Sequence, residues 1–193
     1  MKAVSCLPDD YEKYYSVNLQ KDKKSALTVN VIAIIIAVVM VVPVCFFVPI
    51  SALFNMEGET LNVVLRFLSL GLLSVAYLVL HEVVHGIAMK ICGTKKVKYG
   101  FTGMYAFAGS EDYYDKKSYI FIALAPVVLW GIVLAIVNFF VPTEWFWVIY
   151  IIQIINISGA AGDYFVTVKF FGFPKDILIH DCGVEMSVYK KIN

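Results

Sequence analysis

Residues 79–91 (LVLHEVVHGIAMK) place two histidines and a glutamate inside an otherwise apolar stretch. On an α-helix, positions four residues apart are separated by about 40° around the axis, so His81 and His85 share a face. Two imidazoles spaced in this way can bind one zinc ion through their ring nitrogens. Glu82 lies on the neighbouring flank, where its carboxylate can act as general base toward metal-bound water. The pattern therefore predicts His81 and His85 as metal ligands and Glu82 as the catalytic residue.

The alternative is a group of buried polar residues that holds helices together without a metal ion. All three ionisable side chains occur deep in an apolar segment, where the burial of each alone costs free energy. A bound cation offsets this cost for all three at once, so we favour the metal site.

A catalytic zinc site normally takes three protein ligands and leaves one position open for water. At 1.5 Å per helical residue, His81 lies about 30 Å from Leu61, where its apolar segment begins, and Asp163 lies about 27 Å from Trp145. Asp163 is also the only carboxylate of that last apolar segment. Because both segments start on the same side of the membrane, Asp163 lies at nearly the same depth as the two histidines. We therefore predict Asp163 as the third ligand. The alternative is that Asp163 contacts another helix without a metal ion.

Two residues after the last apolar segment could take the place of Asp163. His180 and Asp181 are adjacent in the chain, and either could fold back to the site as a ligand. A histidine on a solvated segment is the simpler interpretation, but the rival stays open.

Asn156 lies on the same helical stripe as Asp163, with Gly159 and Ala160 between them. Small residues beside an acid allow another helix to approach closely. The Asn156 amide could donate a hydrogen bond to a substrate backbone or to a tetrahedral oxyanion. It could equally hold two helices together, and the sequence leaves both possibilities open.

The composition is that of an integral membrane protein. Of 193 residues, 60% are hydrophobic and 16% are charged, whereas a soluble domain is nearer half apolar and a quarter charged. The net charge is only +1, so the protein has no strong positive potential and we do not expect it to bind nucleic acid. The expected partners are the lipid bilayer and a peptide or membrane-protein substrate. Four apolar segments reach the length of about 20 residues that a bilayer requires: 27–50, 61–92, 118–141 and 145–168.

The basic residues predict the orientation. Lysines cluster before the first apolar segment, between the second and third, and after the fourth, whereas the connections 51–60 and 142–144 contain no lysine or arginine. With four spans every basic segment lies on one side, which the positive-inside rule assigns to the cytosol. We therefore predict a multi-pass protein of the cell membrane, both termini cytosolic, with three parts: an arm (1–26), a transmembrane catalytic core (27–168) and a tail (169–193).

The predicted fold class is all-α, with about four transmembrane helices enclosing a metal site. The segment between the second and third helices is too polar to span a membrane. Aromatic residues alternate there with smaller ones around Gly100 and Gly103, which indicates a short β-hairpin: Tyr99, Phe101, Tyr105 and Phe107. Such a hairpin could hold an extended peptide by adding a strand to its edge. An amphipathic loop at the membrane interface is the alternative.

Three stretches together resemble a known family: HEVVHGIAMKICGTKKVKYGF, YIFIALAPVVLWG and NISGAAGDYFV. They are similar to the putative zincin peptidases of bacterial membranes, a family distantly similar to the site-2 protease intramembrane metalloproteases. The resemblance implies zinc held by His81, His85 and Asp163, with Glu82 as base and acid. In the wider site-2 protease pattern a proline separates the asparagine from the aspartate and glycine follows the aspartate. Here no proline separates Asn156 from Asp163, and the glycine precedes the aspartate.

The leading hypothesis is a membrane-embedded zinc metalloprotease that hydrolyses peptide bonds of membrane-associated substrates near the cytosolic face. Glu82 would take a proton from water activated by Zn²⁺ and pass it to the leaving amine. The alternative is a non-catalytic membrane protein, such as an immunity or scaffold factor, with a structural metal or none. Ion transport ranks last, because the first and third apolar segments contain no charged residue and no histidine.

Overall fold

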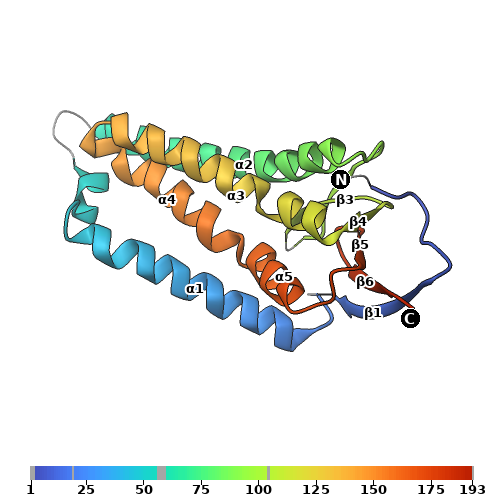
Figure 1. The fold of residues 1–193 in the computed structure, drawn as a ribbon. Helices are drawn as coiled ribbons and strands as arrows, with labels where there is room; N and C mark the ends of the chain where they lie inside the picture. The colour runs from blue at the N-terminus through green and yellow to red at the C-terminus, as the bar shows by residue number, and fades with distance from the viewer. Residues whose placement is uncertain (1–2, 19, 56–59, 104, 193) are drawn as a thin grey trace. The chain divides into compact units, whose positions relative to one another are not determined.

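The structure is a computed structural model that describes residues 3–18, 20–55, 60–103 and 105–192. Its described residues are mostly helical, as the sequence predicted (Figure 1). The helices are α1 (Lys23–Cys45), η1 (Ile50–Phe54, a 3-10 helix), α2 (Thr60–Ile91), α3 (Lys116–Phe140), α4 (Thr143–Gly159) and α5 (Ala161–Phe171). The strands are β1 (Tyr11–Val17), β2 (Lys98–Phe101), β3 (Ala106–Gly109), β4 (Tyr113–Asp115), β5 (Ile177–Asp181) and β6 (Met186–Lys191).

Four helical segments of the described chain are long and apolar enough to cross a membrane. They are α1, α2, α3 and the stretch Thr143–Phe171, which contains α4 and α5. These segments match the predicted apolar segments, and they support the assignment as a membrane protein. The fourth differs in one respect, because Gly159 ends α4 and a second helix begins at Ala161. Of the connection 51–60, which the orientation argument used, residues 56–59 lie outside the described residues.

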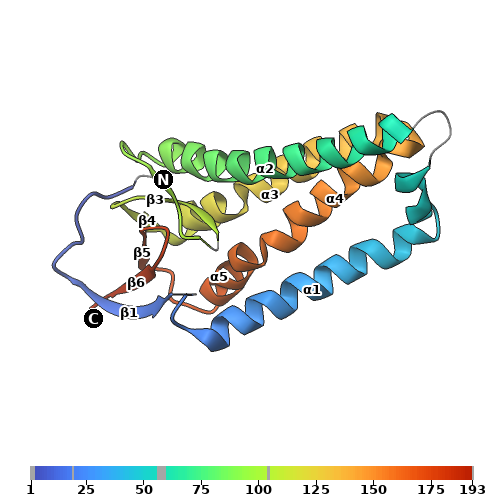
Figure 2. The same ribbon diagram turned by 180° about the vertical axis from the view of Figure 1, so that it is seen from behind.

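The structure contains β-sheet that the all-α prediction lacks, and in this respect the predicted fold class was wrong. A four-stranded antiparallel sheet has the order β1-β6-β5-β4. Tyr11 of β1 lies opposite Lys191 of β6, so the two terminal segments of the chain lie side by side (Figure 2). Each strand is short, and β1 and β4 pair with strands far away in the chain, so local periodicity does not reveal these pairings.

The hairpin expected between the second and third helices is present. Strands β2 and β3 pair antiparallel, with Lys98 opposite Gly109 and Phe101 opposite Ala106. Between the two strands the backbone N–H of Thr102 donates to the carbonyl of Tyr105 over 3.0 Å. Met104, inside this segment, lies outside the described residues.

The chain divides into two compact units, which we describe separately. The first consists of Met1–Val29, His81–Pro126 and Gly162–Asn193, and it contains both sheets. The second consists of Asn30–Leu80 and Val127–Ala161, and it contains most of α1 together with α4.

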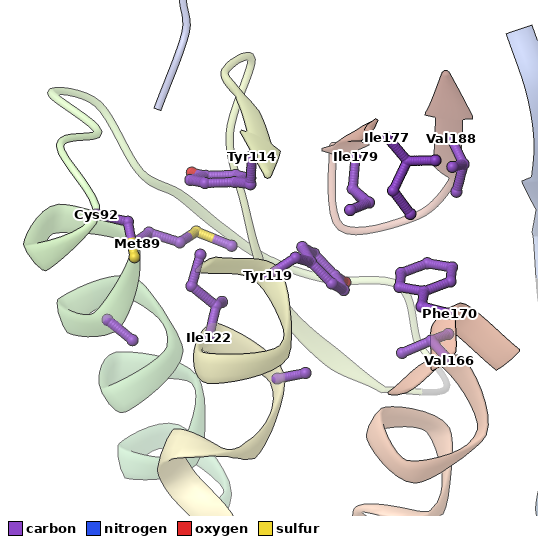
Figure 3. Close-up of a cluster of buried hydrophobic side chains, with 12 residues drawn as sticks. Met89, Cys92, Tyr114, Tyr119, Ile122, Val166, Phe170, Ile177, Ile179 and Val188 are labelled. Carbon is purple, nitrogen blue, oxygen red and sulfur yellow. The ribbon is translucent and has the colours of Figure 1, made fainter. Parts of the chain in front are cut away.

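The core of the first unit packs helices against the four-stranded sheet (Figure 3). The end of α2, the start of α3 and α5 each contribute buried side chains, as do β4, β5 and β6. The largest fully buried members are Met89, Tyr114, Ile122, Phe170, Ile177 and Ile179. Because α2, α3 and α5 share this core, the side chains that they carry one or two turns away have fixed relative positions.

Candidate metal centre

Helix α2 places His81 and His85 one turn apart on the same face. Their ring centroids are 4.8 Å apart, with the ring planes at 79° to each other. Glu82 follows His81 on the same uninterrupted helix. The helical geometry assumed from the sequence is therefore present.

Asp163 lies in the first turn of α5, and its carboxylate points to both histidines. The Oδ2 atom lies 3.7 Å from Nε2 of His81, and Oδ1 lies 3.8 Å from Nε2 of His85. One ligand atom from each of the three residues lies within 4.8 Å of the others. The side chains are largely withdrawn from solvent, with 12% of each histidine and 24% of the aspartate exposed. The structure thus brings together the three residues that the sequence proposed as ligands.

A second contact defines the protonation of His85. Its Nδ1 atom lies 2.9 Å from the carbonyl oxygen of Ile122 on α3. A carbonyl oxygen can only accept, so Nδ1 carries the proton and donates it. In the neutral ring Nε2 then bears a lone pair, and this is the atom that lies near Asp163. A histidine held in this way by a backbone carbonyl is typical of metal ligands.

A proline explains why that carbonyl is available. In an α-helix the carbonyl of residue 122 would accept from the backbone N–H of residue 126. Residue 126 is a proline inside α3, so it has no N–H to donate. The interruption in α3 therefore leaves the Ile122 carbonyl for His85.

The distances fit a shared cation better than a direct contact. At 3.7 and 3.8 Å the nitrogen and oxygen atoms are too far apart for a hydrogen bond, even if a histidine were doubly protonated. Two ligands of a tetrahedral zinc ion lie about 3.3–3.5 Å apart, a few tenths of an ångström closer. Two imidazoles and one carboxylate are also the ligand set of known catalytic zinc sites. The residues present therefore fit a divalent metal ion.

Glu82 is surrounded by groups of the same unit. The backbone of Ala108 on β3 and the charges of His85 and Asp163 act electrostatically on its carboxylate. Glu82 is not among the three residues that converge on one point. This position agrees with a base beside the metal, although the catalytic role itself stays a prediction.

The β2–β3 hairpin lies against the helix that carries the histidines. A Cβ atom added to Gly86, the residue after His85, would lie 1.9 Å from the hydroxyl oxygen of Tyr99 on β2. Only glycine at this position lets Tyr99 approach α2 so closely. Together with the Ala108 contact, this packing places both strands of the hairpin beside the candidate site.

The rival ligands form other contacts in the first unit. His180 packs on the ring of Tyr113, 5.0 Å away between centroids, and its Nε2 lies 3.6 Å from a carboxylate oxygen of Glu111. Asp181 accepts hydrogen bonds from the hydroxyl of Tyr119 and from the backbone N–H of Gly183. Among the described residues neither belongs to the converging group, so the geometry favours Asp163.

Asn156 forms hydrogen bonds between helices of the second unit. Its Oδ1 accepts from the hydroxyl of Tyr77 on α2 over 2.9 Å, and its Nδ2 donates to the carbonyl of Val127 on α3 over 3.2 Å. The side chain is fully buried. These contacts agree with the possibility that Asn156 holds two helices together. Its contact with substrate stays a prediction.

Comparison with known proteins agrees with this geometry. A family model described as "Putative zincin peptidase" matches residues 74–178, more than half of the chain. The chain belongs to this family. Membership supports a zinc-dependent peptidase at a coarse level, and the matched segment contains all three converging residues and Glu82. No curated protein and no solved structure matches the chain.

Sequence reasoning did not find every residue around the zincin-like site. No sequence pattern marks Tyr119 or Ala108 as a site residue. Tyr119 belongs to an apolar helix, and Ala108 is a small residue of a strand. Their proximity follows from the packing of α3 and of the hairpin.

Proposed function

We propose that the protein is a membrane-embedded zinc metalloprotease that hydrolyses peptide bonds of membrane-associated substrates near the cytosolic face. One observation supports this most strongly. Nε2 of His85, which is a hydrogen-bond acceptor in the neutral ring, and a carboxylate oxygen of Asp163 face each other at 3.8 Å, with Nε2 of His81 beside them. Two acceptors in this arrangement repel each other unless a cation lies between them.

The reaction would use residues on α2, α5 and β3. His81, His85 and Asp163 would hold the zinc ion, which supplies Lewis acidity toward a carbonyl and lowers the pKa of water. Glu82 would accept a proton from the attacking water and transfer it to the nitrogen of the leaving amine. The backbone of Ala108 would keep the Glu82 carboxylate in position between these two transfers.

The hairpin supports a peptide as the substrate. In the described part of the chain, β2 pairs with β3 and with no further strand. An extended peptide could pair with the other edge of β2 by strand addition. A peptide bound in this way exposes its amide bonds, which a helical segment does not.

The test compares the protein with its Glu82→Gln variant in the same detergent micelles, with a set of labelled single-span peptides as probe. We expect wild type to cleave at least one peptide when loaded with zinc. Glu82→Gln should retain zinc and lose cleavage by about a hundredfold or more, because it removes the proton acceptor. Glu12→Gln, an exposed glutamate of β1, serves as the control and should cleave like wild type. Equal cleavage by Glu82→Gln and wild type would contradict the mechanism.

A further inference from the structure

Asp181, the last residue of β5, is a carboxylate that the proposed mechanism does not use. The hydroxyl of Tyr119 on α3 donates to its Oδ2, and the backbone N–H of Gly183 donates to its Oδ1 over 2.8 Å. Both oxygens are therefore held in place by the protein. The family match ends at residue 178 and does not cover Asp181.

The Asp181 carboxylate lies near the candidate metal centre. Asp181 and His85 contact α3 one turn apart, because Tyr119 donates to Asp181 and the carbonyl of Ile122 accepts from His85. Over this short distance the charge of Asp181 also acts on Asp163 and Glu82. Among the described residues, no lysine or arginine forms an ion pair with any of these three carboxylates. Three acids thus gather around two imidazoles, with no protein cation to balance them.

This arrangement has an energetic cost when no cation is present. Like charges in a region of low dielectric constant repel each other, and each loses hydration. Burial raises the pKa of Asp181 above its ordinary value, with the neighbouring charge of Asp163 as a further cause. A divalent cation held by Asp163 and the histidines would turn the repulsion into attraction.

We propose that Asp181 is an outer carboxylate of the metal centre, which raises the affinity for a divalent cation through its charge without binding the ion. This inference rests on the proposed function in one respect, since it requires that the centre binds a cation. Asp181 is a positioning residue in this account, because it acts on the ion from a distance.

Two observations separate this role from the alternatives. Both Asp181 oxygens already accept hydrogen bonds, and the three converging ligand atoms belong to other residues. A direct ligand is therefore not expected here. A purely structural role would not need the charge, because an asparagine could keep both partners: its carbonyl can accept from Gly183, and its amide can donate to the Tyr119 oxygen.

The experiment measures the Kd for Zn²⁺ by competition with a chelator, using the purified full-length protein in detergent. We expect Asp181→Asn to raise the Kd about tenfold, because a unit charge acts on a divalent ion over a short distance in a medium of intermediate dielectric constant. Asp176→Asn removes the same charge from an exposed position five residues earlier, and it should stay within about twofold of wild type. Asp163→Asn should raise the Kd about a hundredfold or more, since it removes a ligand.

Each other outcome overturns the inference. An unchanged Kd for Asp181→Asn would show that its charge has no effect, and a loss as large as that of Asp163→Asn would make Asp181 a ligand. If wild type itself binds no zinc, the proposed function fails as well, so the two failures are distinguishable. Should Asp181→Asn not fold, Asp181→Ser has to weaken binding and Asp181→Glu has to retain it. As a second readout, metal-free Asp181→Asn should melt no lower than wild type, whereas a structural role requires a lower melting temperature.

Discussion

The ring of His85 on α2 is hydrogen-bonded to the carbonyl of Ile122 on α3, four residues before a proline. The contact joins two helices, and it also selects the ring nitrogen that faces Asp163. The backbone hydrogen bond that Pro126 removes from α3 thus leaves a carbonyl that orients His85 on α2.

Pro126→Ala restores a backbone N–H that can compete for the Ile122 carbonyl. We expect the His85 ring to lose part of its orientation and the Kd for Zn²⁺ to rise, by up to about tenfold, as for other groups that hold metal-binding histidines. Pro43→Ala makes the same exchange inside α1 and should leave the affinity unchanged. Equal affinities for the two variants would contradict the role of Pro126.

The buried Asp181 carboxylate predicts a pH dependence of the metal-free protein. Its pKa is raised in the folded state, so between the ordinary value of 3.8 and the raised value the folded state binds more protons than the unfolded state. The free energy of unfolding therefore falls as pH rises above about 4. Asp181→Asn removes this contribution, so its melting temperature should fall less with pH than that of wild type. Parallel melting curves for the two proteins in the presence of a chelator would refute this.

The Tyr77–Asn156 hydrogen bond should stabilise the second unit. Tyr77→Phe leaves Oδ1 of Asn156 without this donor in a buried place, and we expect the free energy of unfolding to fall by about 1 kcal/mol. Asn156→Ala should add less to Tyr77→Phe than it costs alone, because the two residues share one interaction. Both variants should keep the wild-type Kd for Zn²⁺. An Asn156→Ala variant that is as stable as wild type but inactive would instead support contact with substrate.

The approach of Tyr99 to α2 predicts an effect on the hairpin. Gly86→Ala places a methyl group where the Tyr99 hydroxyl lies, so the Tyr99 ring has to move away from α2, which weakens the packing of β2 on this helix. We expect slower peptide cleavage with zinc binding retained. Gly71→Ala is the matched control on the same helix, since nothing lies within 4 Å of its added Cβ, and it should be neutral or stabilising by up to about 1 kcal/mol. Removal of the obstacle in a Gly86→Ala/Tyr99→Ala double variant should restore part of the activity, and failure to do so would refute the steric cause.

Much of the candidate site could be predicted because its geometry is local or is set by span length. The spacing of His81 and His85 depends only on helical periodicity, and Asp163 followed from counting helical rise along two spans. The hairpin followed from the glycines around its turn. These features need no knowledge of which distant segments meet.

The remaining features depend on tertiary packing. The pairing of β1 with β6 joins strands from opposite ends of the chain, and short strands with mixed polarity show no clear alternation. The position of Asp181 beside the centre depends on this sheet, so the sequence suggested it only as a rival ligand. The end of α4 at Gly159 was likewise not foreseen, because apolar composition continues through Ala160 and Ala161.

Metal analysis of the purified protein tests the central claim most directly, namely that His81, His85 and Asp163 together hold one divalent cation. Wild type, His81→Ala, Asp163→Asn and His180→Ala would each be loaded with zinc, desalted and measured for zinc per chain. We predict about one zinc ion in wild type and in His180→Ala, which alters the histidine outside the converging group, and less than about a tenth of that in the other two. Zinc that persists in His81→Ala and Asp163→Asn, or that is lost in His180→Ala, would contradict the account.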